Sequence, residues 1–65
     1  MNQPTEEQSA RLVNLLSSPY WETYEKSRAV YLWPKRTEEQ AEEALENYAT
    51  IIVERGRNAK AVPQS

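Results

Sequence analysis

The chain has 65 residues and a formal net charge of −2, and it contains neither cysteine nor histidine. Disulfides and the usual zinc sites are therefore excluded as stabilisers of this small chain. The weak net charge argues against strong non-specific binding to nucleic acid, which needs a basic surface. We predict one small domain over residues 1–65, with flexible tails at 1–4 and 57–65, and no metal or cofactor.

Apolar residues are too scattered to form a membrane span. The longest unbroken apolar run is Ala29–Trp33, whereas a helix needs about 20 apolar residues to cross a bilayer. The N-terminus shows no signal-peptide pattern. We expect a cytoplasmic protein that does not bind membranes.

A first helix is predicted from Glu6 to about Ser17. Thr5 and Gln8 have the spacing of a capping box, in which each side chain accepts a hydrogen bond from a backbone N–H group of the first turn. Aliphatic side chains gather along one side of the segment that follows. They are Leu12, Val13, Leu15 and Leu16.

Ser18 and Pro19 interrupt this helical pattern. Serine is a favoured N-cap, and proline is favoured at the first helical position. We predict that Ser18 caps a second helix, that Pro19 opens it, and that it runs from Tyr20 to about Tyr31. A single helix with a kink at Pro19 is the alternative.

The segment Ala29–Trp33 has two interpretations. It is rich in residues that favour strands, and Pro34 pushes Trp33 towards an extended conformation. A lone strand is unstable unless another chain pairs with it. We favour a helix end that leads into a turn over residues 33–36, with a strand as the alternative.

The strongest helical signal extends from Thr37 to Gly56. Thr37 and Gln40 form a second capping box, and Gly56 is suited to the left-handed conformation that ends many helices. An apolar stripe recurs along this segment at steps of four, three and four residues. Its members are Ala41, Leu45, Tyr48 and Ile52.

These elements predict an all-α fold. Two short helices, or one kinked helix, would pack antiparallel on the long helix, because short connections favour antiparallel neighbours. So few core-forming residues are available that the hairpin is expected to form a homodimer through the apolar stripe. The predicted dimer interface is Ala41, Leu45, Tyr48 and Ile52.

No pattern of catalytic residues is present. Glu38, Glu42 and Glu46 form one helical row, which we interpret as a solvated face and not as an acid/base pair with separated pKa values. The same row could imitate DNA phosphates, so an acidic DNA mimic is one alternative. A small helix-turn-helix regulator is another, although Trp21 and Glu22 are not the side chains that read a major groove.

Aromatic residues are the most informative feature of the sequence. Tyr20, Tyr24 and Tyr31 share one helical stripe and are the expected core members, whereas Trp21 and Trp33 are expected to project outward. Tryptophan and tyrosine dominate the energy of many interfaces. We therefore expect a non-enzymatic interaction protein with a partner-binding site on the aromatic segment. The predicted site is Trp21, Trp33, Tyr20, Tyr24, Arg28 and Tyr31.

The run from Leu12 to Trp21 (L-V-N-L-L-S-S-P-Y-W), together with the small size and capped helices, resembles small phage-encoded proteins that disarm host machinery. The quorum-sensing anti-activator type is the nearest, a helical dimer that binds a host transcription activator and a pilus-assembly ATPase. The resemblance covers about the first third of the chain. It implies an inhibitor that occupies the surface of a host protein, in the cytoplasm of the host cell.

Overall fold

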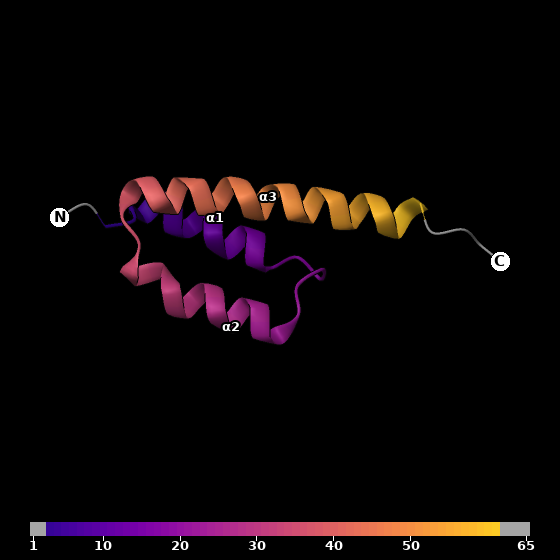
Figure 1. The fold of residues 1–65 in the computed structure, drawn as a ribbon, viewed down its shortest axis with the longest axis horizontal. Coiled ribbons are helices and arrows are strands. Elements are labelled where there is room, and N and C mark those ends of the chain that lie inside the picture. The colour runs from indigo at the N-terminus through magenta and orange to yellow at the C-terminus, as the bar shows by residue number, and fades with distance from the viewer. Residues whose placement is uncertain (1–2, 62–65) are drawn as a thin grey trace.

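In a computed structural model, which describes residues 3–61 and the side chains of residues 3–59, the chain forms three α-helices and one short 3-10 helix (Figure 1). The predicted all-α class is confirmed, and no strand occurs in the described range. The elements are α1 (Glu6–Leu16), α2 (Thr23–Leu32), η1 (Trp33–Lys35) and α3 (Glu38–Ala61).

The start of α1 is the predicted one. The Thr5 hydroxyl accepts a hydrogen bond from the Gln8 backbone N–H at 3.0 Å, and the Gln8 side chain accepts one from the Thr5 N–H at 3.0 Å. Both N–H groups would otherwise lack a partner at the helix terminus. The capping box therefore fixes where α1 begins.

The predicted start of the second helix is wrong, and so is the kinked alternative. Ser18 accepts a hydrogen bond from the Tyr20 N–H at 3.3 Å, so it stabilises a turn and not a helix start. The chain turns until Glu22, whose N–H donates to the Glu25 carboxylate at 2.8 Å. Helix α2 then begins at Thr23, four residues after Pro19.

The favoured interpretation of Ala29–Trp33 is confirmed. Helix α2 continues to Leu32, and Trp33 and Pro34 belong to the tight η1 turn. The Arg36 N–H closes this turn on the Trp33 carbonyl at 3.1 Å. Pro34 is tolerated there because the first turn of a helix does not use its missing N–H.

Thr37 caps α3 as predicted, with reciprocal bonds to Gln40 of 3.0 and 3.1 Å. The predicted end at Gly56 is wrong, because α3 continues to Ala61 and no described glycine has a positive φ. Residues 57–61 are therefore helical and do not form a tail. Their alanine, arginine and lysine residues have high helix propensity. Residues 1–2 and 62–65 of the predicted tails lie outside the described residues.

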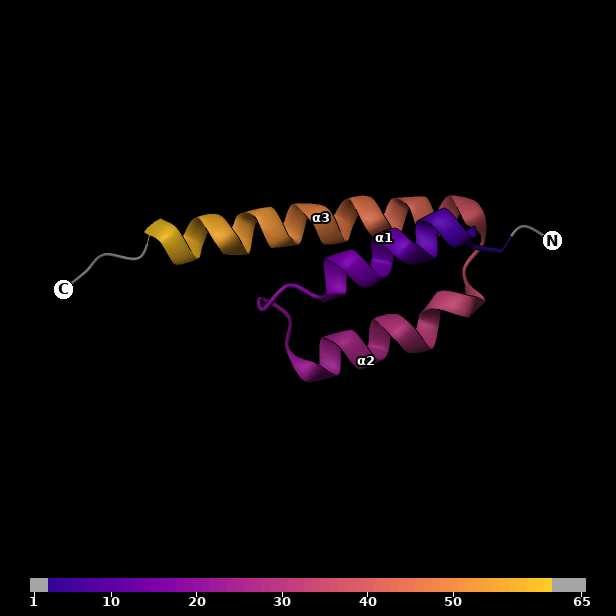
Figure 2. The same cartoon turned by 180° about the vertical axis from the view of Figure 1, so that it is seen from behind.

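Two chain reversals set the helix directions. Helix α2 runs opposite to α3 as expected, whereas α1 runs in the same direction as α3 (Figures 1 and 2). The closest helix packing is between α1 and α3, and α2 packs closely only with η1. The buried cluster that joins α1, η1 and α3 consists of Leu12, Trp33, Ala41, Ala44 and Leu45.

Candidate functional site

Helix α2 contributes almost nothing to the core. Ala29 is its only buried residue, while Tyr24 is 70% exposed, Val30 59% and Tyr31 66%. The expectation that the tyrosines are core members is therefore wrong for Tyr24 and Tyr31. Single exposed apolar residues are normal on protein surfaces, whereas a contiguous exposed apolar patch often marks a binding site.

The expectation that both tryptophans project outward is also wrong. Trp21 is 9% exposed and Trp33 8%. The Trp21 indole N–H donates to the Leu15 carbonyl at 2.7 Å, and the Trp33 indole N–H donates to the Ser9 hydroxyl at 3.0 Å. Because α1 provides an acceptor for each indole, both rings can be buried with their N–H groups satisfied. The two tryptophans, one on each side of α2, thus connect the ends of this helix to α1.

Arg55 of α3 holds the N-terminal end of α2. Its guanidinium forms a bidentate ion pair with Glu25 (2.9 and 2.8 Å), donates to the Tyr20 carbonyl at 2.7 Å and lies 5.3 Å from the Trp21 ring centre. The hydrogen bonds from Arg55 lower the pKa of the Glu25 carboxyl to about 2, so this group is ionised at neutral pH. The attachment places α2 at a fixed distance from α3.

Between α2 and α3 lies a groove of two adjoining hollows, with volumes of about 290 and 310 Å³, which share Leu32 and Arg36. We call it the α2–α3 groove. The hollow of about 290 Å³ is lined on the α2 side by Tyr24, Glu25, Arg28, Ala29 and Leu32. On the opposite side it is lined by Trp21, Tyr48 and Ile51.

The aromatic wall of the groove is rigidly packed. The Trp21 and Tyr48 rings meet edge to face, with centroids 5.5 Å apart and planes at 82°. This edge-to-face geometry is favourable for two aromatic rings. A ligand that enters the groove therefore meets a preformed apolar surface.

A third hollow lies on α2 outside the groove, next to Lys26, Ser27, Val30 and Tyr31. None of these residues lines the α2–α3 groove, and Ser27 and Tyr31 lie about 160° from Ala29 around the helix. Lys35 lies 4.9 Å from the Tyr31 ring centre, a cation–π contact. This outer face of α2 has no wall from a second element, so it is less enclosed than the α2–α3 groove.

The fold buries two residues of the predicted dimer stripe and leaves the other two partly exposed. Ala41 and Leu45 have 0% exposure in a single chain, because they pack in the cluster with Leu12 of α1. Tyr48 and Ile52 are half-buried, and Tyr48 lines the α2–α3 groove. Ala41 and Leu45 are thus core residues with no surface left for a second chain. The homodimer itself stays a prediction.

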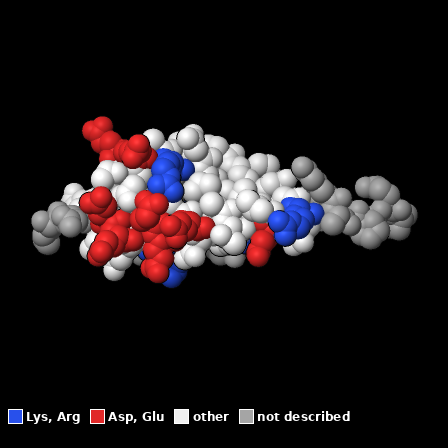
Figure 3. All heavy atoms as spheres, turned by 90° about the horizontal axis from the view of Figure 1, so that it is seen from above, with Lys and Arg blue, Asp and Glu red and all other residues white. Residues whose placement is uncertain are grey.

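The acidic row is only partly a solvated face. The Glu42 carboxylate accepts hydrogen bonds from Gln8 at 3.1 Å and from Arg11 at 3.0 and 3.1 Å, and these bonds lower its pKa. It therefore helps to hold α1 on α3. Glu38 and Glu46 are exposed, and Figure 3 shows acidic side chains gathered over the N-terminal half of α3.

The predicted partner-binding residues are thus only partly brought together. Trp21, Tyr24 and Arg28 line the α2–α3 groove. Tyr20 lies nearby against Gly56, whereas Trp33 and Tyr31 do not line the groove.

The sequence analysis missed two residues that line the groove, Ile51 and Arg36. Ile51 was detectable as an apolar residue beside the α3 stripe, whereas nothing in the sequence marks Arg36.

No protein-family model, curated protein or solved structure matches this chain. Within residues 3–61 no helix is both long and apolar enough to cross a membrane.

Proposed function

We propose that the chain is a non-enzymatic protein-binding module that takes an apolar segment of a partner protein into the α2–α3 groove. The observation that carries this proposal is the groove itself, which lies beside a helix with one buried residue, Ala29. Closer packing of α2 on α3 would stabilise the fold alone by burying Leu32 and Ile51. In the fold, the Arg55–Glu25 ion pair joins the N-terminal end of α2 to α3, and Trp33 is buried just after the C-terminal end of α2, so the groove lies between these two attachments.

The composition of the groove fits an interface. Its centre presents Trp21, Tyr48 and Ile51, and its rim presents Tyr24 and Arg28. Binding sites in proteins are enriched in tyrosine, tryptophan and arginine, with apolar contacts at the centre and polar contacts around them. A rigid aromatic wall also lowers the entropy that is lost on binding.

The lowered pKa values of two carboxyl groups support a non-enzymatic role. Glu25 and Glu42 both have pKa values below the usual range, because hydrogen bonds from neighbouring side chains favour the ionised form. A general acid needs the opposite shift, which brings its pKa towards neutral pH. Both carboxylates hold helices together instead.

Inhibition is the proposed consequence of binding. A chain of 65 residues that binds through one groove and carries out no reaction acts on its partner by covering part of the partner's surface. The resemblance of the Leu12–Trp21 run to phage-encoded anti-activators supports the same role. A host protein, such as a transcription activator or an ATPase, is the proposed target.

The test compares two equivalent substitutions on α3. Ile51→Gln places a polar amide in the groove, whereas Val53→Gln makes the same kind of change at a position that is 56% exposed and does not line the groove. Proteins captured from bacterial lysate by the wild-type chain and by Val53→Gln, but lost with Ile51→Gln, would identify groove-dependent partners. Circular-dichroism melts of both variants control for folding.

Two results would contradict the proposal. Captured proteins that are lost with Val53→Gln and kept with Ile51→Gln would place the binding site on another face of α3. A wild-type dimer in sedimentation equilibrium that only Ile51→Gln dissociates would mean that a second copy of the chain, and not a partner protein, occupies the groove.

A further inference from the structure

We infer that the α2–α3 groove recognises an acidic amphipathic segment, in which an apolar side chain packs on Trp21 and Ile51 and a nearby carboxylate pairs with Arg36 and Arg28. This inference rests on the proposed function and names the chemistry of its partner. The juxtaposition that carries it is an apolar wall beside two guanidinium groups on one groove.

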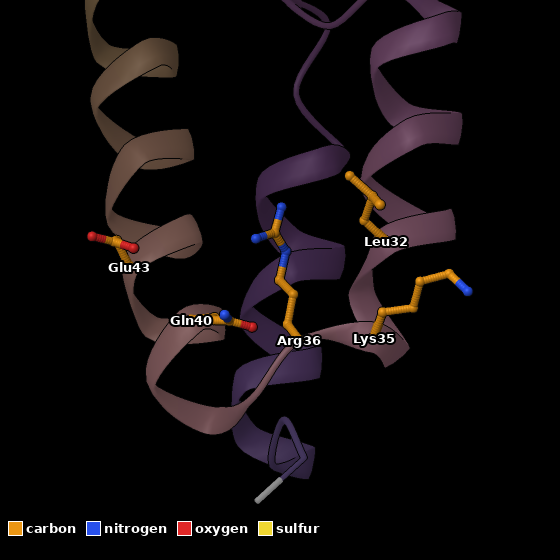
Figure 4. Close-up of a pocket in the computed structure, with 5 residues that line it drawn as sticks. All are labelled: Leu32, Lys35, Arg36, Gln40 and Glu43. Atoms are coloured by element: carbon orange, nitrogen blue, oxygen red, sulfur yellow. The ribbon is translucent and has the colours of Figure 1, made fainter.

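The backbone places Arg36 at the junction of the two hollows. Its N–H is bonded to the Trp33 carbonyl at 3.1 Å, and the next residue, Thr37, is fixed by its capping bonds to Gln40. The side chain then rises between α2 and α3, in front of α1 in Figure 4. It lines both hollows, so a segment that fills either hollow lies beside this side chain.

Arg36 has no acceptor of its own among the described residues. Its Nε is buried without a hydrogen-bond partner, although buried polar groups are nearly always paired. Glu43 lines the same hollow but forms no ion pair with it. A carboxylate in the groove would accept from the terminal nitrogens and, after a small rotation of the side chain, from Nε.

Two of the three other arginines differ from Arg28 and Arg36. Within the described residues, Arg11 pairs with Glu42 and Arg55 pairs with Glu25, so each of these two guanidinium groups joins helices. The third, Arg57, is exposed and lines neither hollow of the groove. Arg28 and Arg36 form no such pair and line the same hollow. The groove also contains two carboxylates, Glu25 and Glu43, but Glu25 is already paired with Arg55. Arg28 and Arg36 therefore make the groove complementary to an acidic ligand.

The volumes of the two hollows fit a short segment of a partner protein. Hollows of about 290 and 310 Å³ lie at the lower end of the range for small-ligand sites, about 300–1,000 Å³. One apolar side chain and one carboxylate three or four residues apart on a helix lie on the same face, so a single turn of a partner helix can provide both. Arginine binds a carboxylate in bidentate fashion, which adds direction to the contact.

The test uses a random-peptide library displayed on phage and selected on the immobilised full-length chain. We expect the peptides lost with Ile51→Gln to be enriched in a large apolar residue with Asp or Glu three or four residues away in the sequence. Arg36→Gln should weaken a selected peptide about tenfold or more, and Arg36→Lys, which keeps the charge without the planar fork, should weaken it less. Lys26→Gln is the matched control, because it removes the same charge from the outer face of α2.

The Arg36 Nε–H resonance gives a direct readout in ¹⁵N-labelled protein. A selected acidic peptide should shift this resonance together with the Trp21 indole resonance, and the same peptide with Glu replaced by Gln should shift only the indole. Melts of Arg36→Gln and Lys26→Gln show whether either variant is unfolded.

The outcomes separate this inference from the proposed function. Peptides that depend on Ile51 but carry no acidic residue, and that bind Arg36→Gln as well as the wild type, would overturn the inference and leave the groove as the binding site. Peptides that are more sensitive to Lys26→Gln than to Arg36→Gln would also overturn it. If no selected peptide depends on Ile51, both the inference and the proposed function are wrong.

Discussion

Replacing Gly56 by alanine should stabilise the chain. Gly56 lies within α3, five residues before its last residue Ala61, and its φ is not positive. Glycine in a helix interior costs about 1 kcal/mol relative to alanine, largely through the entropy of the unfolded chain. The left-handed role expected from the sequence would give the opposite sign, because alanine resists a positive φ.

The atoms around Gly56 determine how much stability the alanine substitution adds. A Cβ atom there would lie 3.4 Å from Tyr20 Cε2, 3.6 Å from its hydroxyl oxygen and 3.7 Å from Cζ, which are ordinary van der Waals distances. Alanine therefore adds a contact without a clash. Since helices fray near their ends, we expect a net stabilisation of about 0.5–1 kcal/mol.

Urea denaturation monitored by circular dichroism measures this difference in the free energy of unfolding. Asn58→Ala is the control, because Asn58 is an exposed position of α3 where only helix propensity changes. A destabilisation of about 1 kcal/mol by Gly56→Ala, with a gain for neither variant, would refute the argument. It would mean that α3 ends at Gly56 in solution.

Two further predictions concern the attachment of α2. For Glu25, whose pKa falls from its usual 4.5 to about 2 in the folded chain, the contribution to stability is complete above pH 4.5 and is lost as the pH falls towards 2. The melting temperatures of wild type and Glu25→Gln should therefore differ most near neutral pH and converge near pH 2, and a constant difference would contradict the pairing with Arg55. Trp33→Ala should cost about 3–5 kcal/mol of unfolding free energy, whereas Tyr31→Ala, at 66% exposure, should cost about 1 kcal/mol or less. Equal costs in urea denaturation would show that Trp33 is not a core residue.

The sequence by itself determined the helix starts at Glu6 and Glu38. Each start depends on a capping box within four residues, Thr5 with Gln8 and Thr37 with Gln40, and such bonds form wherever the local chain allows them. The turn after Leu32 was predictable for the same reason, since Pro34 acts on its immediate neighbours. The all-α class follows from these local signals.

Tertiary structure alone decided which side chains are buried and where the groove lies. Trp21 and Trp33 are buried because Leu15 and Ser9 of α1 offer acceptors to their indole N–H groups, and no periodicity within α2 contains that information. Arg36 enters the groove because the packing of α2, η1 and α3 brings two hollows together at its side chain. Contacts between residues far apart in sequence depend on how the helices pack, and many sequence patterns are compatible with each packing.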